Sequence, residues 1–172
     1  MTPLTDNATR IRDDPTMTSY RTFFVTTITI QRLPIFRREA TARLLIEILA
    51  HYRDAGKFLL HEFVIMPDHF HALITPTEQI SLERAMQFIK GGFSYRYDKR
   101  GHIWQPSFTN HRIKDWQDYE QHRDYIRMNP VRAHLASKPE AYPYCSAAGV
   151  LKMDAVPPGL KPRKCEDAVT RR

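Results

Sequence analysis

Two strand-like segments separated by a two-residue turn restrict the fold of this chain more than any other feature. Residues 58–66 and 69–75 are dominated by apolar, β-branched and aromatic side chains, which favour extended structure. Pro67 and Asp68 lie between them. Proline presets φ for the first central position of a turn, and aspartate suits the next position. The sequence therefore predicts an antiparallel β-hairpin over residues 58–75.

Four further segments flank this hairpin and extend the prediction to a whole fold. Residues 23–30 are aromatic and β-branched throughout, which predicts a strand, and residues 102–113 read as another extended segment. Apolar side chains recur at helical spacing over residues 42–52 and 82–97, which predicts two helices. The order β-α-β-β-α-β predicts an α+β fold of the ferredoxin-like type, an antiparallel sheet with two helices on one face.

A third helix is predicted after this unit, at residues 115–128. It should end before Pro130, because the residue ahead of a proline avoids helical φ and ψ. Helical phase puts Tyr119 on the packing stripe and Tyr125 at the edge of that stripe. Asn129 lies one turn beyond Tyr125 and shares its face. In isolation, the pair also fits a half-buried tyrosine followed by a helix-ending amide.

The two ends of the chain differ in composition from its middle. Residues 1–19 show no periodicity, and residues 150–172 are proline-rich and basic, so we expect flexible tails around one domain at residues 20–149. No apolar run approaches the roughly 18 residues that span a bilayer. The polar start does not resemble a secretory signal. We therefore expect a cytoplasmic protein that does not contact membranes.

The charge balance points toward polyanions. The chain carries 26 Lys and Arg against 19 Asp and Glu, a formal net charge of +7, and its pI is about 9.6. Such a surface suits binding to a phosphate backbone, because each neutralised phosphate releases condensed counterions. A basic surface without a nucleic-acid partner fits the same numbers, so charge alone leaves the function open.

The tripeptide His69-Phe70-His71 is the most informative local motif. Residues two apart on a strand point to the same face, so two imidazoles should emerge side by side while Phe70 faces the core. Neutral imidazole is a common metal ligand, and adjacent histidines can share one ion. When the motif stands alone, a surface or hydrogen-bonded pair of histidines is the commoner interpretation, so the motif needs a partner.

Three sequence blocks together carry a resemblance to a known family. Residues 66–73 read MPDHFHAL, Trp104 is followed by Gln105, and residues 124–132 read DYIRMNPVR. These blocks resemble the IS200-like, single-tyrosine transposases of the HUH superfamily and, more narrowly, the REP-associated tyrosine transposases. The resemblance extends over about residues 20–146.

The resemblance implies a role for each of four residues. His69 and His71 match the metal-binding HUH pair, Tyr125 matches the nucleophile, and Asn129 falls where relatives place a third polar ligand. The implied activity is cleavage and rejoining of single-stranded DNA near palindromic hairpins through a 5′-phosphotyrosine intermediate. Mg²⁺ or Mn²⁺ is the expected ion, and the imidazoles favour Mn²⁺. Relatives act as monomers or as dimers that exchange tyrosine helices, and the REP-associated resemblance favours a monomer bound to DNA of the nucleoid.

Basic and aromatic side chains on neighbouring elements could line a groove for the unpaired strand, because bases stack on aromatic rings and phosphates pair with cations. The candidates for DNA binding are Arg21, Lys90, Arg96, Trp104, Arg112, Lys114 and Arg132.

Two other functions fit parts of the pattern. A non-catalytic module that binds single-stranded nucleic acid has precedent among ferredoxin-like sheets, but it leaves the pairing of His69 and His71 with Tyr125 unexplained. A metal-dependent hydrolase would use the two histidines as ligands and water as nucleophile. That enzyme would cleave DNA without Tyr125 and would form no covalent complex with it.

Overall fold

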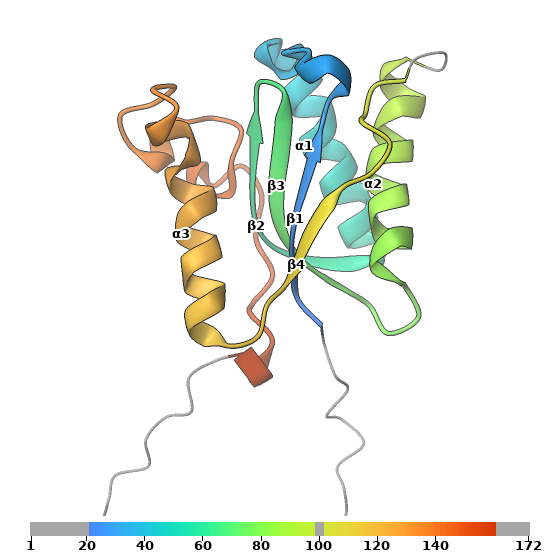
Figure 1. Cartoon of the computed structure of the whole chain (residues 1–172), viewed down its shortest axis with the longest axis vertical. Helices are drawn as coiled ribbons and strands as arrows, with labels where there is room; N and C mark the ends of the chain where they lie inside the picture. The colour runs from blue at the N-terminus through green and yellow to red at the C-terminus, as the bar shows by residue number, and fades with distance from the viewer. Residues whose placement is uncertain (1–20, 99–101, 161–172) are drawn as a thin grey trace, which may run out of the picture.

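The computed structural model of the protein describes residues 21–98 and 102–160 (Figure 1). The expected tail at residues 1–19 and the last part of the expected C-terminal tail, residues 161–172, lie outside the described residues. Within the described ranges, no helix is long and apolar enough to cross a membrane.

Four strands form one antiparallel sheet. They are β1 (Phe23–Ile28), β2 (Phe58–Met66), β3 (His69–Pro76) and β4 (Thr109–Arg112). The spatial order is β2-β3-β1-β4, which is the order that a ferredoxin-like fold requires, so the predicted fold is confirmed. The two-residue turn at Pro67 and Asp68 connects β2 to β3 as predicted.

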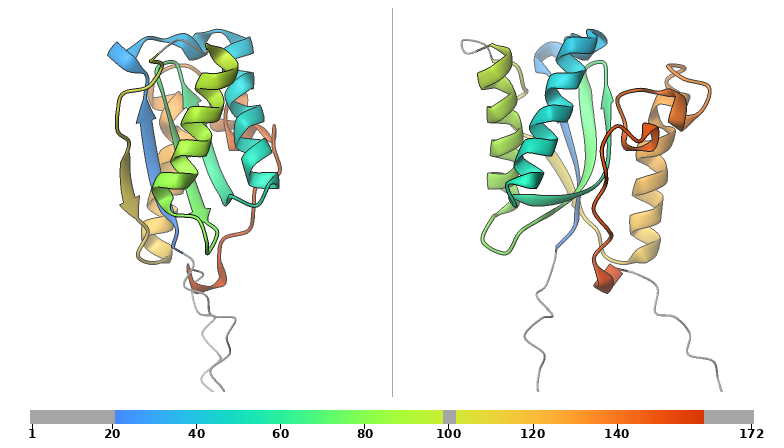
Figure 2. Two further views of the ribbon diagram at one scale, coloured as in Figure 1. Left: turned by 90° about the vertical axis from the view of Figure 1, so that its right-hand side faces the viewer. Right: turned by 180° about the vertical axis from the view of Figure 1, so that it is seen from behind.

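Two helices cover one face of the sheet and a third covers the other (Figure 2). Helices α1 (Glu39–Asp54) and α2 (Leu82–Tyr97) pack on the first face, where the larger hydrophobic core lies. Helix α3 (Trp116–Arg132) packs on the opposite face over a smaller core that includes Tyr119 and Ile126. The strand period therefore sorts side chains between two cores, as when Phe63 enters the first and Val64 the second.

The prediction for residues 102–113 was too long, because only Thr109–Arg112 form a strand. Trp104 contributes a single bridge to Thr29. Pro106 lies between these two contacts and has no N–H with which to continue the ladder. The indole of Trp104 is drawn into the first core instead.

The predicted end of the last helix was also wrong, because α3 continues through Pro130 to Arg132. Pro130 is buried in the last turn. The amide groups of Ala133 and Leu135 donate to the carbonyls of Asn129 and Pro130 and close the chain beyond the proline. Pro130 has no N–H to donate to the Ile126 carbonyl, and its burial offsets part of the loss of that hydrogen bond.

The chain that follows α3 covers the exposed edge of β2. Ile65 donates its amide to the Tyr144 carbonyl at 2.8 Å. The Asp154 carboxylate accepts from the Leu60 amide at 2.8 Å and pairs with Arg53 at 3.2 Å. Residues 150–160, which the composition assigned to a tail, thus contact the sheet. An uncovered strand edge would present unpaired backbone groups, and these contacts satisfy some of them.

Candidate functional site

The paired histidines lie on the face of the sheet that α3 covers. His69 begins β3 and His71 follows two residues later, with ring centroids 4.8 Å apart. Phe70 points the other way and is fully buried in the first core. The expectation that strand alternation separates the imidazoles from Phe70 is therefore confirmed.

The orientation of His69 is fixed by an acidic neighbour. Its Nδ1 lies 2.6 Å from a carboxylate oxygen of Asp68, and the other oxygen of Asp68 accepts from Arg32 at 3.1 Å. Burial opposes ionisation of Asp68, but hydrogen bonds and positive charge from His69 and Arg32 outweigh it and hold the pKa of the carboxyl below its ordinary value. In the neutral form of the ring, Nδ1 donates to this carboxylate and Nε2 is the acceptor.

His71 is more deeply placed, with 5% of its surface exposed. Its Nδ1 lies 2.7 Å from the Thr26 hydroxyl on the neighbouring strand. Burial, and secondarily the charge of His69, lower the pKa of His71 to about 3, so its ring is neutral at physiological pH. Its Nε2 is buried without any hydrogen-bond partner among the described residues. A buried polar atom without a partner carries an energetic cost, and a bound cation would remove that cost.

Tyr125 reaches the same place from the opposite layer. It lies on α3 with 41% of its surface exposed, and its ring meets the His71 ring edge to face at a centroid distance of 5.3 Å. The Phe24 ring packs against both, with its centroid 5.3 Å from that of His71 and 5.8 Å from that of Tyr125. The Arg132 guanidinium lies 5.7 Å from the centre of the Tyr125 ring. Asn129 follows Tyr125 by one helical turn and is half-buried.

An ion pair between an exposed arginine and a buried glutamate fixes α3 on the sheet beside this site. Arg127 donates two hydrogen bonds to one carboxylate oxygen of Glu62 on β2, at 3.1 and 2.6 Å. Ser146 donates to the other oxygen of the same carboxylate, and only 6% of the Glu62 side chain is exposed. Tyr119 and Ile126 bury the apolar stripe of the helix, as predicted for Tyr119. These contacts determine where α3 presents Tyr125.

The predicted DNA-binding residues do not form one group. Trp104 is 8% exposed, packs against Phe36 and Phe93, and donates its indole N–H to the Lys90 carbonyl. The expectation that it stacks on bases was therefore wrong, because the ring already fills a place in the core. Arg96 on α2 pairs with Glu47 on α1 at 2.7 Å. Both helices cover the face of the sheet opposite to the histidines.

The remaining candidates vary in their surroundings. The Lys90 ammonium donates to the carbonyls of Gln105 and Ser107, and burial lowers its pKa. Arg132 is a predicted cation whose guanidinium lies beside the ring of Tyr125. The exposed side chains, besides Arg132, are Arg21, Arg112 and Lys114.

Four residues that contact the site were not predicted from the sequence to be part of it: Phe24, Thr26, Arg32 and Asp68. Asp68 directly precedes His69 in the turn, and that adjacency could have marked it as an orienting group. Thr26 pairs with His71 across the β1–β3 register, and no feature of the sequence near either residue shows that pairing.

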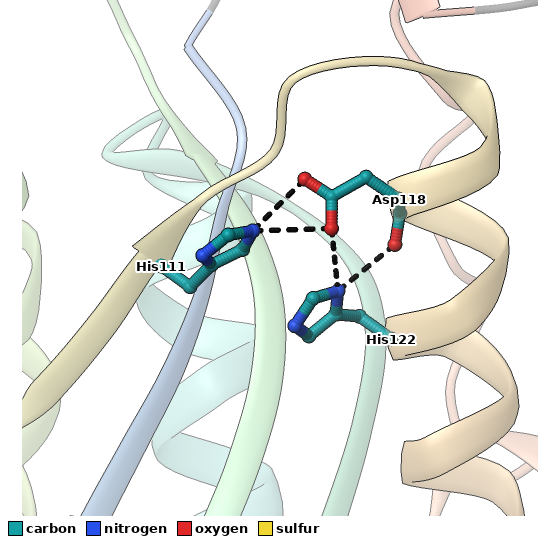
Figure 3. Close-up of side chains that lie close together, drawn as sticks. All are labelled: His111, Asp118 and His122. Atoms are coloured by element: carbon teal, nitrogen blue, oxygen red, sulfur yellow. Dashed lines mark hydrogen bonds and ion pairs between the residues drawn. The ribbon is translucent and has the colours of Figure 1, made fainter.

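A second cluster of histidines lies on the same side of the sheet. His111 on β4 faces Asp118 and His122 on α3, and the three side chains converge on one point (Figure 3). His122 also packs against Phe24, with a centroid distance of 4.7 Å.

The fold and the site together define a ferredoxin-like α+β protein in which a pair of imidazoles on the sheet meets a tyrosine on the covering helix. The family model for IS200-like transposases matches residues 18–129, and the chain belongs to that family. The predicted family resemblance is confirmed.

Individual relatives agree with this assignment. The REP-associated tyrosine transposase of Escherichia coli (strain K12) is 31% identical over 88 residues, covering 51% of this chain and 53% of that protein. The chain thus spans about half the length of this relative. A Haemophilus influenzae protein provisionally assigned to the same group is 26% identical over 145 residues, covering 72% of this chain and 82% of that protein. A solved structure of a REP-associated tyrosine transposase bound to a REP hairpin matches with a TM-score of 0.61 and 25% identity, covering 80% of this chain and 86% of that one.

Proposed function

We propose that this protein cuts and rejoins single-stranded DNA, with Tyr125 as the nucleophile. One observation carries the proposal: the exposed ring of Tyr125 lies against His71, whose Nε2 is buried and has no hydrogen-bond partner within the described part of the chain. The proposed nucleophile and a nitrogen that could bind a metal ion thus lie close together between the sheet and α3. Membership of a transposase family supports DNA strand transfer as the reaction.

His69, His71 and Asn129 would hold a divalent ion, Mg²⁺ or Mn²⁺. The donor set fits such an ion, because Asp68 and Thr26 orient the two imidazoles with Nε2 available and Asn129 adds an amide oxygen. When bound, the ion supplies charge neutralisation for the scissile phosphate. Nitrogen ligands favour Mn²⁺ over Mg²⁺, which prefers oxygen ligands alone.

The reaction retains the energy of the phosphodiester bond. The Tyr125 phenol loses its proton as its oxygen attacks phosphorus, the bond from phosphorus to the 3′-oxygen breaks, and the departing oxygen takes up a proton. The products are a 5′-phosphotyrosine and a free 3′-hydroxyl. Attack by another 3′-hydroxyl reverses these steps and joins strands without ATP. Arg132, beside the Tyr125 ring, is placed to pair with the phosphate.

The proposed substrate is a hairpin formed by a palindromic single strand. The matched solved structure is bound to a REP hairpin. In this chain, the net charge of +7 and the exposed Arg112 and Lys114 favour a phosphate backbone. The proposed active form is a monomer. In support, Arg127 on α3 binds Glu62 on the sheet of the same chain, so the tyrosine helix and the histidines of one site can come from one chain.

A covalent adduct tests the proposal. Labelled hairpin oligonucleotides, taken from any palindromic repeats found in the DNA beside the gene, are incubated with the protein and Mn²⁺ and then separated on a denaturing gel. We expect a protein–DNA adduct with the wild type and with Tyr119→Phe, a matched change in the same helix, and none with Tyr125→Phe. Binding without cleavage would favour a non-catalytic module. Cleavage that survives Tyr125→Phe would favour a hydrolase, and either result would overturn the proposal.

A further inference from the structure

His111, Asp118 and His122 offer one ligand atom each, and these atoms lie within 4.8 Å of one another. His111 extends from edge strand β4, while Asp118 and His122 are one turn apart at the start of α3 (Figure 3). The two imidazole rings stack with centroids 4.7 Å apart and point their nitrogens at the same carboxylate. Helical period brings Asp118 and His122 together, and the turn between β4 and α3 brings His111 to them.

The distances from the Asp118 carboxylate to the two imidazoles fit a coordination shell. Nε2 of His111 lies 2.9 and 3.1 Å from the two Asp118 oxygens, and Nδ1 of His122 lies 3.0 Å from one of them. Two ligands that are each about 2.1 Å from a shared ion are about 3.0–3.4 Å apart at the angles of four- and six-coordinate ions. The backbone carbonyl of Asp118 adds another oxygen, 2.9 Å from Nδ1 of His122.

The surroundings of the Asp118 carboxylate favour a bound cation. The Lys114 amide donates a hydrogen bond to it at 2.9 Å, and only 15% of the Asp118 side chain is exposed. His111 is 41% exposed, so water can reach the cluster and complete a coordination shell. Two imidazoles and one carboxylate make a ligand set that suits zinc and its first-row neighbours.

This cluster shares no residue with the histidines of β3. The Phe24 ring contacts both groups, with its centroid 5.3 Å from that of the His71 ring and 4.7 Å from that of the His122 ring. Phe24 also pairs with His111 across the β1–β4 register. An ion at the cluster would join β4 to α3 one turn ahead of Tyr125.

We propose that His111, Asp118 and His122 form a second divalent-metal site, of the zinc class, which fastens the first turns of the tyrosine helix to edge strand β4. The site is structural: it holds the helix that carries Tyr125 and does not contact the scissile phosphate. It is independent of the proposed reaction, since it requires only the ligands and the fold.

Metal titration of the full chain tests this proposal. Zn²⁺ binding is measured by calorimetry, and Co²⁺ binding by its visible absorption, in a His69→Ala/His71→Ala variant that lacks the first histidine pair. We expect this variant to retain one ion per chain, with a Co²⁺ spectrum typical of nitrogen and oxygen ligands. Adding His111→Ala or Asp118→Asn should abolish that binding, while adding His51→Ala, a change to an exposed histidine on α1, should leave it intact.

Thermal melting keeps the test decisive if the double variant folds poorly. Zn²⁺ should raise the Tm of the wild type and of His69→Ala, and the rise seen in His69→Ala should disappear when His111→Ala is added to it. Binding that is lost with the β3 histidines but unaffected by His111→Ala would overturn the second site while leaving the first. An unchanged Tm in the wild type on addition of Zn²⁺ would also overturn it, with the cluster then a hydrogen-bonded contact alone.

Discussion

The ring of Tyr125 meets the ring of His71 edge to face, with centroids 5.3 Å apart, although 53 positions separate an α3 residue from a β3 residue. This contact joins the two halves of the site. It depends on the α3 anchors and on the hydrogen bonds that orient the imidazoles, and both can be changed without touching the proposed nucleophile or ligands.

Thr26→Val should weaken metal binding at the β3 histidines. The change removes the hydroxyl that orients His71 through Nδ1, and loss of such an orienting group costs about 10–100-fold in metal affinity. Mn²⁺ titration of the DNA-cleaving activity measures the effect.

Thr27→Val is the matched control. The Thr27 hydroxyl faces the other core and is buried without a hydrogen-bond partner among the described residues, so its removal should stabilise the fold by up to about 1 kcal/mol. Equal Mn²⁺ dependence in the two variants would contradict an orienting role for Thr26.

Arg127→Ala should destabilise the protein by about 1–3 kcal/mol, because it leaves the buried Glu62 carboxylate without its charged donor. Since the same pair fixes α3, adduct formation should slow as well. Arg123→Ala is the control: its partners Glu120 and Asp124 belong to the same helix, and its loss should cost no more than about 0.5 kcal/mol. Urea unfolding measures the free energy of unfolding of both variants. Similar losses of stability in Arg127→Ala and Arg123→Ala would refute the anchoring role of Arg127.

Adjacent glycines in α2 should respond to alanine with opposite signs. A Cβ on Gly92 would lie 2.6 Å from the ring of Tyr52, which is held by stacking on Phe88, so Gly92→Ala should destabilise. A Cβ on Gly91 meets no atom of the described residues within 4 Å, and Gly91→Ala should stabilise by up to about 1 kcal/mol through helix propensity. Thermal melts of the two variants should therefore move in opposite directions, and parallel shifts would contradict the packing described for Gly92.

Tyr119 makes stability sensitive to alkaline pH. Burial, and secondarily the charge of Glu62, raise the pKa of Tyr119 from 10.0 to about 12. Because the folded pKa lies above the unfolded one, its stabilising effect is fully present below pH 10 and is lost as the pH rises toward 12. Tyr119→Phe cannot ionise, so its free energy of unfolding should fall less steeply over that window. Parallel curves for variant and wild type would argue against burial of the phenol.

Local patterns in the sequence predicted the hairpin at residues 58–75 and the face shared by His69 and His71, because strand period and turn chemistry act over a few residues. The placement of Trp104 in the core could not be predicted in this way. Its neighbours come from three distant segments, and its aromatic character fits a base-stacking surface as well as a core.

The end of α3 and the edge of β2 show the same limit. The rule against helical residues before a proline predicted an end before Pro130, but burial of that residue outweighs a local preference. The basic, proline-rich composition after residue 149 predicted a flexible tail and gave no sign of the role of Asp154, whose carboxylate accepts a hydrogen bond from a backbone amide of β2. Hydrogen bonds between such distant residues leave no periodic signal.

The most direct test of the central claim is mass spectrometry of the covalent adduct after digestion with nuclease and trypsin. Trypsin cuts after Lys114, Arg123 and Arg127, so Tyr119 and Tyr125 fall in separate peptides, residues 115–123 and 124–127. We predict a nucleotide phosphate on the peptide of residues 124–127, linked to Tyr125 through its 5′ side. A phosphate on another tyrosine, or strand cleavage that leaves every tyrosine unmodified, would contradict the account.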